Sequence, residues 1–397
     1  MNKNRRQTLC GPGIPCRLAP GLTAAALLAL AACGREPADS PQPPPPERVE
    51  AREVAAVDEF GPAPARIAGV AFWAHPGLPF NGLVLAATAD GIVAYNIEDG
   101  REVAAAGGFS ATGLSVAYAG EGPSAQGYAV ARVERGDESG ERSDGPAYRF
   151  YAVDNAERTL VLQTTLFIGG RGVEGFCVGP TREGGLALHE MRADGWRATA
   201  LEIRDGAVTA TATESGTHEG GFSRCAVDDV DGAVYAAAPD GAIYRLEAGA
   251  EPALLARTPV KEPAGIGLAL NGLVEGGPTE ECCGQIALLD GATGEVYLYD
   301  REDGALLGAV RLKASFDVDG VGEATAMGLA YGNYGAIYRD GALALATNGA
   351  RPVLRLAPLN GVMDALGKPL GPTANPRDLS PQEEEEPFVI DIDIVNP

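Results

Sequence analysis

The hydrophobic residues of the chain are gathered into short runs that glycine, aspartate and asparagine interrupt. Examples are residues 83–87 (LVLAA), 234–237 (VYAA) and 295–299 (EVYLY). Short apolar runs bounded by turn-forming residues are typical of β-strands. No stretch of useful length with the period of a helix lies between residues 66 and 358. The pattern therefore predicts an all-β fold.

The strand-forming region also repeats. A glycine followed by leucine or phenylalanine and then a further apolar residue recurs along it, and in several copies a second glycine and an aromatic strand follow. The repeated glycines are Gly113, Gly175, Gly267 and Gly328. Six units over roughly 293 residues (66–358) give about 49 residues each, the length of a four-stranded blade with variable loops. We predict a six-bladed β-propeller over residues 65–358, with each repeated glycine in a crowded innermost strand.

Residues 1–32 have the pattern of an export signal. Four basic residues precede an apolar run at 22–32, which is too short to span a bilayer because spanning takes about 20 residues. The run ends in Leu-Ala-Ala-Cys-Gly, which resembles the bacterial lipobox. The resemblance implies that Cys33 is acylated and anchors the chain in the cell envelope, with the outer membrane favoured because Gly34 follows the cysteine. The alternative is ordinary signal cleavage beside a coincidental cysteine.

Two polar segments flank the predicted propeller. Residues 33–64 include Pro-Gln-Pro-Pro-Pro-Pro and are interpreted as a semi-extended tether. Residues 359–397 are interpreted as an acidic, low-complexity tail. Its last part, 388–395, alternates apolar and acidic residues, which is a strand signal. That segment is an edge strand or a loose tail, or alternatively a β-segment that binds a partner.

Composition narrows the classes of partner. The chain has 397 residues, 45% of them hydrophobic and 21% charged, which is typical of a globular protein. Its formal net charge is −23. Nucleic acid is not expected as a partner, because duplex binding needs Lys and Arg to neutralise phosphates. Binding to anionic lipid through charge alone is excluded on the same ground.

Two cysteines occupy like positions in consecutive repeats. Cys177 and Cys225 both follow the start of a predicted innermost strand. Because the cell envelope is oxidising, a disulfide between them is plausible; two buried thiols are the alternative. Cys282 and Cys283 are adjacent, and a bridge between neighbours would be strained.

Residues 66–345 resemble the bacterial β-propeller phytases. The resemblance is clearest at 71–76 (AFWAHP), 148–154 (YRFYAVD) and 225–235 (CAVDDVDGAVY). It implies a six-bladed propeller with a water-filled axial channel, in which carboxylates hold calcium ions that activate water against phytate. Such a 3-phytase is a phosphoric monoester hydrolase. Calcium needs six to eight oxygen ligands, several of them charged, and a metal-bound water then acts as the nucleophile.

The resemblance also suggests site residues. Arg135 falls where the family has a phosphate-binding arginine, and Arg171 and Arg224 lie beside the starts of innermost strands. A guanidinium binds phosphate or carboxylate through paired hydrogen bonds, whereas the alternative is a solvated loop arginine that pairs with a nearby acid. Asp228 and Asp229 match an Asp-Asp pair of the family and, with Glu174, are the candidate metal ligands. Alternatively, the two aspartates begin the turn after an innermost strand.

The sequence departs from the family at the channel itself. The residue before each repeated glycine is often an acid in the family. Here the corresponding residues are Thr112, Glu174, Ser223, Ile266 and Met327. The calcium that the resemblance implies would lack most of its carboxylates.

We therefore predict a propeller that binds a small anionic ligand or an envelope protein partner, with weakened or lost phytate hydrolysis. An active calcium-dependent 3-phytase with relocated ligands is the alternative. A structural protein that joins envelope partners is a second.

Overall fold

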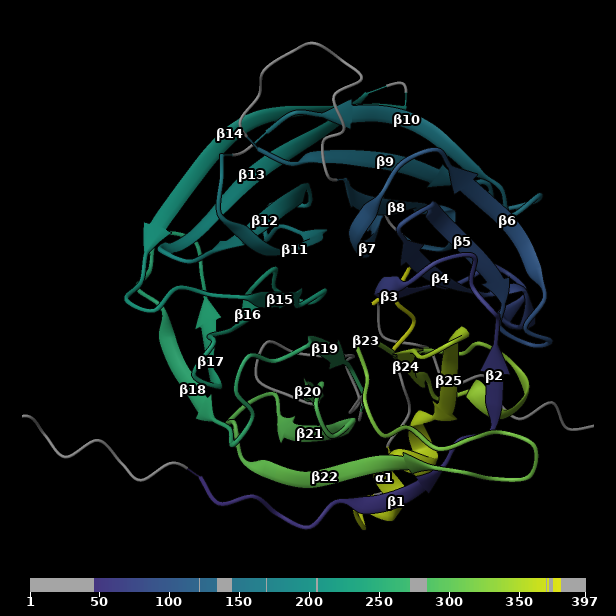
Figure 1. Ribbon diagram of the computed structural model, residues 1–397. Coiled ribbons are helices and arrows are strands. Elements are labelled where there is room, and N and C mark those ends of the chain that lie inside the picture. Colours follow the sequence, from purple (N-terminus) through teal and green to yellow (C-terminus); the bar gives the residue numbers. More distant parts are fainter. Residues whose placement is uncertain are drawn as a thin grey trace, which may run out of the picture. The chain divides into compact units, whose positions relative to one another are not determined.

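The computed structural model describes residues 46–120, 122–133, 145–168, 170–204, 206–271, 284–368, 370 and 374–379. Figure 1 shows that their strands form six sheets around a central axis. Besides the strands, the described part of the chain contains one α-helix, α1 (Leu359–Ala365), after the last strand, and a few short 3₁₀ turns. The predicted all-β, six-bladed propeller is confirmed.

Blades 1 to 3, numbered in chain order, each consist of four consecutive antiparallel strands. Blade 1 contains β3 (Ile67–Trp73), β4 (Leu83–Thr88), β5 (Gly91–Asn96) and β6 (Glu102–Gly107). Blade 2 contains β7 (Ala111–Ala119), β8 (Gln126–Val133), β9 (Ala147–Val153) and β10 (Leu160–Leu166). Blade 3 contains β11 (Val173–Pro180), β12 (Leu186–Arg192), β13 (Gly195–Arg204) and β14 (Ala207–Thr217).

Blades 4 to 6 complete the ring. Blade 4 contains β15 (Arg224–Val227), β16 (Val234–Ala237), β17 (Ala242–Leu246) and β18 (Ala253–Arg257). Blade 5 contains β19 (Gly265–Ala269), β20 (Gln285–Asp290), β21 (Glu295–Asp300), β22 (Leu306–Lys313) and β1 (Arg52–Ala55). Blade 6 contains β23 (Ala326–Ala330), β24 (Ala342–Asn348), β25 (Pro352–Pro358) and β2 (Asp58–Phe60).

The N-terminal strands close the ring. β2 pairs antiparallel with β25 as the outermost strand of blade 6, and β1 adds a parallel strand to β22. Residues 52–60 therefore belong to the propeller, although the sequence analysis placed them in the tether. The two strands are three and four residues long and rich in charge, so local pattern does not reveal them. Their pairing with strands far along the chain buries Val54 and Phe60.

The innermost strands β3, β7, β11, β15, β19 and β23 lie side by side in a closed ring. The repeated glycines allow this close approach. A Cβ at Gly175 would lie 2.3 Å from the Ser223 carbonyl oxygen, and one at Gly267 would lie 2.7 Å from the Leu329 Cβ. Both distances are far inside van der Waals contact. The glycines are therefore required by packing at the axis, as the repeat predicted.

The chain after β25 returns to the propeller. Helix α1 buries Leu359, Val362 and Met363 against the core. Residues 374–379 then lie at one end of the central axis, where Ala374 and Arg377 are buried. Both segments, helix α1 and residues 374–379, fall within the tail predicted at 359–397. Among the described residues, no helix combines the length and the apolar sequence needed to cross a membrane.

Candidate functional site

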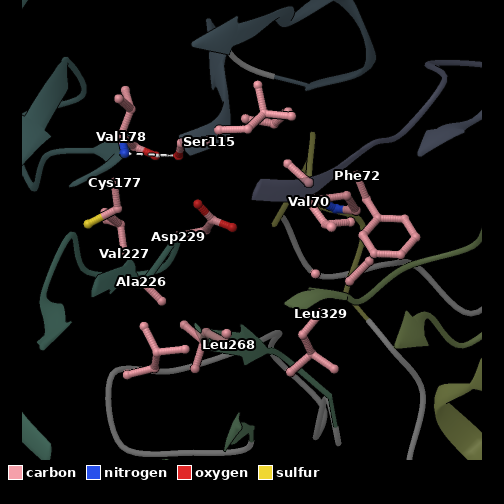
Figure 2. Close-up of a pocket in the computed structure, with 18 of the residues that line it drawn as sticks. Val70, Phe72, Ser115, Cys177, Val178, Ala226, Val227, Asp229, Leu268 and Leu329 are labelled. Atoms are coloured by element: carbon pink, nitrogen blue, oxygen red, sulfur yellow. Dashed lines mark hydrogen bonds between the residues drawn. The ribbon is translucent and has the colours of Figure 1, made fainter. Parts of the chain in front are cut away.

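The six innermost strands enclose an axial channel whose wall is largely apolar. Because all six run in the same direction around the ring, their first residues meet at one mouth and their last residues at the other. The space nearer the second mouth has a volume of about 170 Å³. Its apolar lining includes Val70, Phe72, Leu114, Val116, Val178, Leu268, Met327 and Leu329. Figure 2 shows hydrophobic side chains around the open space, with Val70, Phe72 and Leu329 on one side.

Ser115 and Asp229 are among the polar residues that line this part of the channel. The Ser115 hydroxyl accepts a hydrogen bond from the Val178 amide (3.0 Å), so it links β7 to β11. Asp229 points into the open space (Figure 2) and accepts a hydrogen bond from the Tyr331 hydroxyl. Burial raises the pKa of Asp229 to about 7, an effect that Tyr331 reduces and the nearby Asp228 increases. Asp229 is therefore a proton-exchanging group in an otherwise apolar wall.

This pKa predicts how stability depends on pH. An aspartate in the unfolded chain ionises near pH 3.9, so folding increases the affinity of Asp229 for its proton. The resulting stabilisation is fully present below about pH 4 and is lost as the pH rises through about 7. Asp229→Asn keeps an acceptor for Tyr331 without the charge. We expect it to raise the free energy of unfolding by about 1–3 kcal/mol at pH 8 and by little at pH 4.5.

Urea unfolding at the two pH values measures this difference. Asp90→Asn, at an exposed turn of blade 1, is the matched control and should change stability equally at both. If Asp229→Asn tracked the unsubstituted protein at every pH, the proposed environment of Asp229 would be wrong.

The C-terminal segment borders the same mouth. Pro376 lines the channel next to Tyr331 and Tyr334. The guanidinium of Arg377 lies over the rings of Trp73 (5.0 Å) and Tyr118 (4.8 Å). It donates hydrogen bonds to the Ala74 carbonyl oxygen (2.6 Å), the Ala125 carbonyl oxygen and Asn155 Oδ1 (3.4 Å). One buried side chain thus attaches the segment to blades 1 and 2.

Removing this side chain should release the segment. We expect Arg377→Ala to lower the free energy of unfolding by about 2–3 kcal/mol, because hydrogen bonds to a charged group contribute about 1.5–3 kcal/mol and the carbonyl oxygens would remain partly buried. Limited proteolysis should also cut near residue 377 faster. Arg351→Ala, at an exposed arginine of blade 6, is the control and should change stability by less than about 0.5 kcal/mol. Equal effects of the two substitutions would contradict the attachment.

The other mouth gathers polar side chains around a space of about 140 Å³. Arg132, Thr112, Glu174 and Arg224 line it, together with the first residues of the innermost strands. Arg132 donates to Thr112 Oγ1 (2.9 Å) and to the Val173 carbonyl oxygen (3.0 Å). Burial and the charge of Arg132 lower the pKa of Arg224, whereas Glu174 raises it. Two cations that disfavour each other would be stabilised by an anion between them.

The predicted arginines do not form one group. Arg224 lines this mouth and donates to the carbonyl oxygens of Glu174 (3.1 Å) and Ser223 (2.8 Å), so part of its guanidinium ties blade 4 to blade 3. Arg171 is exposed just before β11. Arg135 lies outside the described residues, as do Cys33, Cys282 and Cys283. Sequence reasoning missed Arg132, since an arginine inside an apolar strand carries no motif.

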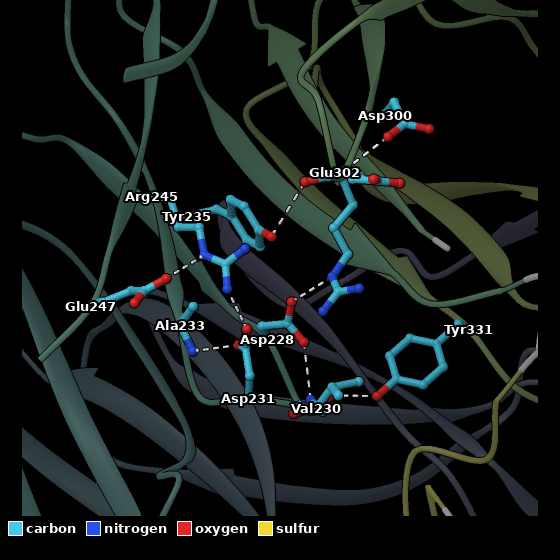
Figure 3. Close-up of polar contacts among 12 residues, drawn as sticks. Asp228, Val230, Asp231, Ala233, Tyr235, Arg245, Glu247, Asp300, Glu302 and Tyr331 are labelled. Atoms are coloured by element: carbon cyan, nitrogen blue, oxygen red, sulfur yellow. Dashed lines mark hydrogen bonds and ion pairs between the residues drawn. The ribbon is translucent and has the colours of Figure 1, made fainter. Parts of the chain in front are cut away.

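The three predicted metal ligands do not lie together either. Glu174 is at the first mouth and Asp229 faces the channel near the second. Asp228 turns the other way into the core, where it accepts a hydrogen bond from Arg301 Nε at 2.5 Å (Figure 3). Its Oδ1 also accepts from the Val230 amide (2.9 Å), as a turn-initiating aspartate would. Over the described ranges, no cluster of three or more His, Cys, Asp or Glu could hold a metal ion.

Cys177 and Cys225 are joined by a disulfide, with their Cα atoms 5.7 Å apart. The bond connects the innermost strands β11 and β15, and therefore blades 3 and 4. Cys177 is the third residue after Glu174, and Cys225 is the second after the corresponding Ser223. The disulfide fixes the spacing of two blades that both contribute to the first mouth.

No family model and no curated protein matches the sequence. Solved structures, in contrast, do match the chain. BBS1N in complex with ARL6DN, soaked with mercury, matches with a TM-score of 0.44 and 13% identity over 77% of this chain and 97% of that chain. Raptor of Chaetomium thermophilum matches with a TM-score of 0.44 and 12% identity over 75% of this chain and 28% of that one.

A second BBS1N–ARL6DN structure, soaked with lead, gives a TM-score of 0.41 and 15% identity over 69% of this chain and 74% of that one. At these scores and identities the similarities carry no argument about function. The pairing of the strands within this chain itself defines it as a six-bladed β-propeller.

Proposed function

We propose that the protein is a lipid-anchored propeller of the bacterial cell envelope that binds a small anionic ligand at the first mouth of its channel, with weakened or lost hydrolysis of phytate. The observation that carries the proposal is the pair Arg132 and Arg224, which line one small space at the axis. Arginine is the residue best suited to bind phosphate or carboxylate, because its planar guanidinium donates paired hydrogen bonds.

The residues around the two arginines favour binding over metal-assisted hydrolysis. Thr112, Ser223, Ile266 and Met327 stand where the phytases that this chain resembles often have acids. Glu174 alone supplies a carboxylate at this position of the repeat. A binding site of two cations and one anion has a net positive charge within a chain of net charge −23. It would therefore attract an anion locally although the whole protein repels anions.

The lipid anchor rests on the lipobox resemblance at Cys33, which lies outside the described residues. Anchoring would place the propeller at the envelope, where the anion would be encountered. Radiolabelled palmitate incorporation that is lost in Cys33→Ser tests this part independently.

Binding and hydrolysis are separated by one pair of measurements on the purified mature chain carrying Cys33→Ser. Calorimetry with myo-inositol hexakisphosphate is expected to detect binding, and phosphate release is expected to stay at background with and without Ca²⁺. Arg132→Gln should weaken binding about tenfold or more, because a charge-assisted hydrogen bond contributes about 1.5–3 kcal/mol. Arg101→Gln, at a side chain that is 83% exposed, is the matched control.

Two outcomes would overturn the proposal. Calcium-dependent phosphate release would assign the alternative, an active 3-phytase with ligands elsewhere in the chain. Absence of anion binding in the folded protein would favour the structural envelope protein instead, and a pulldown that depends on residues 383–397 would support it.

A further inference from the structure

A second space in the protein lies away from the axis, between blades 3 and 4. It has a volume of about 580 Å³, larger than either space in the channel. Its wall comes from the second, third and fourth strands of blade 3 and from the facing side of blade 4. Pockets of about 300–1,000 Å³ are the usual size for small-molecule sites.

The strand register explains why this space exists. Ala187 pairs with Ala200, and Ala200 pairs with Ala212, so one row across β12, β13 and β14 consists of three alanines on the face toward blade 4. Ala198 occupies the next row, opposite His189. The opposite face of blade 3 instead presents large side chains. Leu186, Leu188 and Leu201 pack there against Tyr148 and Phe150 of blade 2.

The blades cannot close over the small side chains. Met191, Trp196 and Phe222 pack between the two blades beside the alanine row, in a cluster that also contains the Cys177–Cys225 disulfide. These large groups and the covalent link hold the blades at a fixed separation. The alanine row therefore faces a space that relaxation of the backbone does not remove.

Two buried polar atoms belong to the lining residues. His189 is 9% exposed and Trp196 is 7% exposed. His189 Nε2 and Trp196 Nε1 have no hydrogen-bond partner among the described residues. Both nitrogens are enclosed by protein, and Trp196 Nε1 lies against Gly216, so a molecule in the space would not reach them. Burial also lowers the pKa of His189 to about 4, so its ring is neutral at the pH of the envelope.

Apart from the exposed Glu183, the charged residues around the space have partners. Arg182 lies 4.0 Å from Glu247, and Asp231 pairs with Arg245. Glu214 Oε1 accepts a hydrogen bond from the Gly249 amide (3.0 Å). The lining thus combines apolar walls with a rim on which most charges are paired. Such a surface favours an uncharged guest over an ion.

From this combination we infer that the space between blades 3 and 4 is a binding site for an uncharged, mostly apolar small molecule. The apolar part would lie against the alanine row. The site is separate from the anion site proposed at the axis, since the two share no lining residue.

The test uses Nile red, an uncharged dye with a carbonyl oxygen whose emission increases in apolar surroundings. The protein is the mature chain with Cys33→Ser, so that no acyl chain competes for the dye. We expect saturable binding of one dye molecule per chain. Dodecanol should displace the dye, and dodecanoate at pH 8 should displace it at least tenfold less well, because its charge has no partner in the site.

Ala200→Leu fills the middle of the alanine row and is expected to weaken dye binding at least tenfold while raising the melting temperature. Ala253→Leu, on the exposed strand β18 of blade 4, adds the same atoms outside the site and should leave binding unchanged. Ala198→Leu is a second filling variant if Ala200→Leu fails to fold.

Equal dye binding by the filled variants and Ala253→Leu would overturn the inference, as would the absence of saturable binding. The outcome is independent of the anion measurements, because none of these substitutions lies at the axis. Preferential displacement by dodecanoate would also contradict it, since it would assign a charged ligand.

Discussion

Replacing Cys177 and Cys225 together with alanine is expected to lower the free energy of unfolding by about 4 kcal/mol. The disulfide closes a loop of 48 residues in sequence, and restricting a loop of this length in the unfolded chain contributes about that amount. The native blades should keep their packing, because the cysteines are buried within an apolar cluster that alanine also suits. Urea unfolding under oxidising conditions measures the difference.

Reduction provides the control for this prediction. Dithiothreitol should destabilise the unsubstituted protein by a similar amount and leave the double variant unchanged. A double variant as stable as the oxidised parent would show that the bond does not form, and that the two cysteines are buried thiols.

Removing the arginine of the buried ion pair should be comparably severe. Arg301 and Asp228 have side chains that are 2% and 0% exposed, and their charges meet between blades 4 and 5. We expect Arg301→Met to lower the free energy of unfolding by about 3–5 kcal/mol, because it leaves the Asp228 carboxylate buried without its cation. Figure 3 shows Asp231 in the same group, where it adds a second negative charge. Urea unfolding near pH 7 is the measurement.

An exposed pair offers a matched comparison. Lys313 pairs with Glu53, and the two side chains are 52% and 68% exposed, so Lys313→Met should cost less than about 1 kcal/mol. Adding Asp228→Asn to Arg301→Met should recover part of the lost stability, since the stranded charge is then removed. If Arg301→Met and Lys313→Met were equally mild, the Arg301–Asp228 pair would not be buried as described.

The two mouths of the channel differ in a way that bears on function. At the first mouth, Arg132 and Arg224 give a cationic site beside Glu174. At the second, Asp229 and the C-terminal segment lie together over an apolar wall. A ligand that entered at the first mouth would meet hydrophobic side chains further along the axis. The geometry therefore suits a small anion held at the surface of the ring more than one that passes through it.

The sequence alone determined the blade structure of this protein. The spacing of the short apolar runs, the repeated glycine of blades 2, 3, 5 and 6 and the turn residues are local features that recur from blade to blade. A periodic pattern of this kind can be recognised without knowing which residues are in contact. The fold class and the number of blades were therefore predictable. The same repeat places Cys177 and Cys225 in neighbouring innermost strands.

Only the tertiary structure decided which of these residues act together. Asp228 and Asp229 are neighbours in sequence, yet one pairs with Arg301 in the core and the other faces the channel, because successive side chains point in opposite directions. The short strands β1 and β2 acquire their structure from partners hundreds of residues away. Arg377 lies in a polar segment without any motif, and it is buried because aromatic rings and carbonyl oxygens of blades 1 and 2 surround it. The alanine row between blades 3 and 4 likewise depends on the tertiary structure. Its members lie far apart in sequence, and the pairing of three neighbouring strands brings them into line.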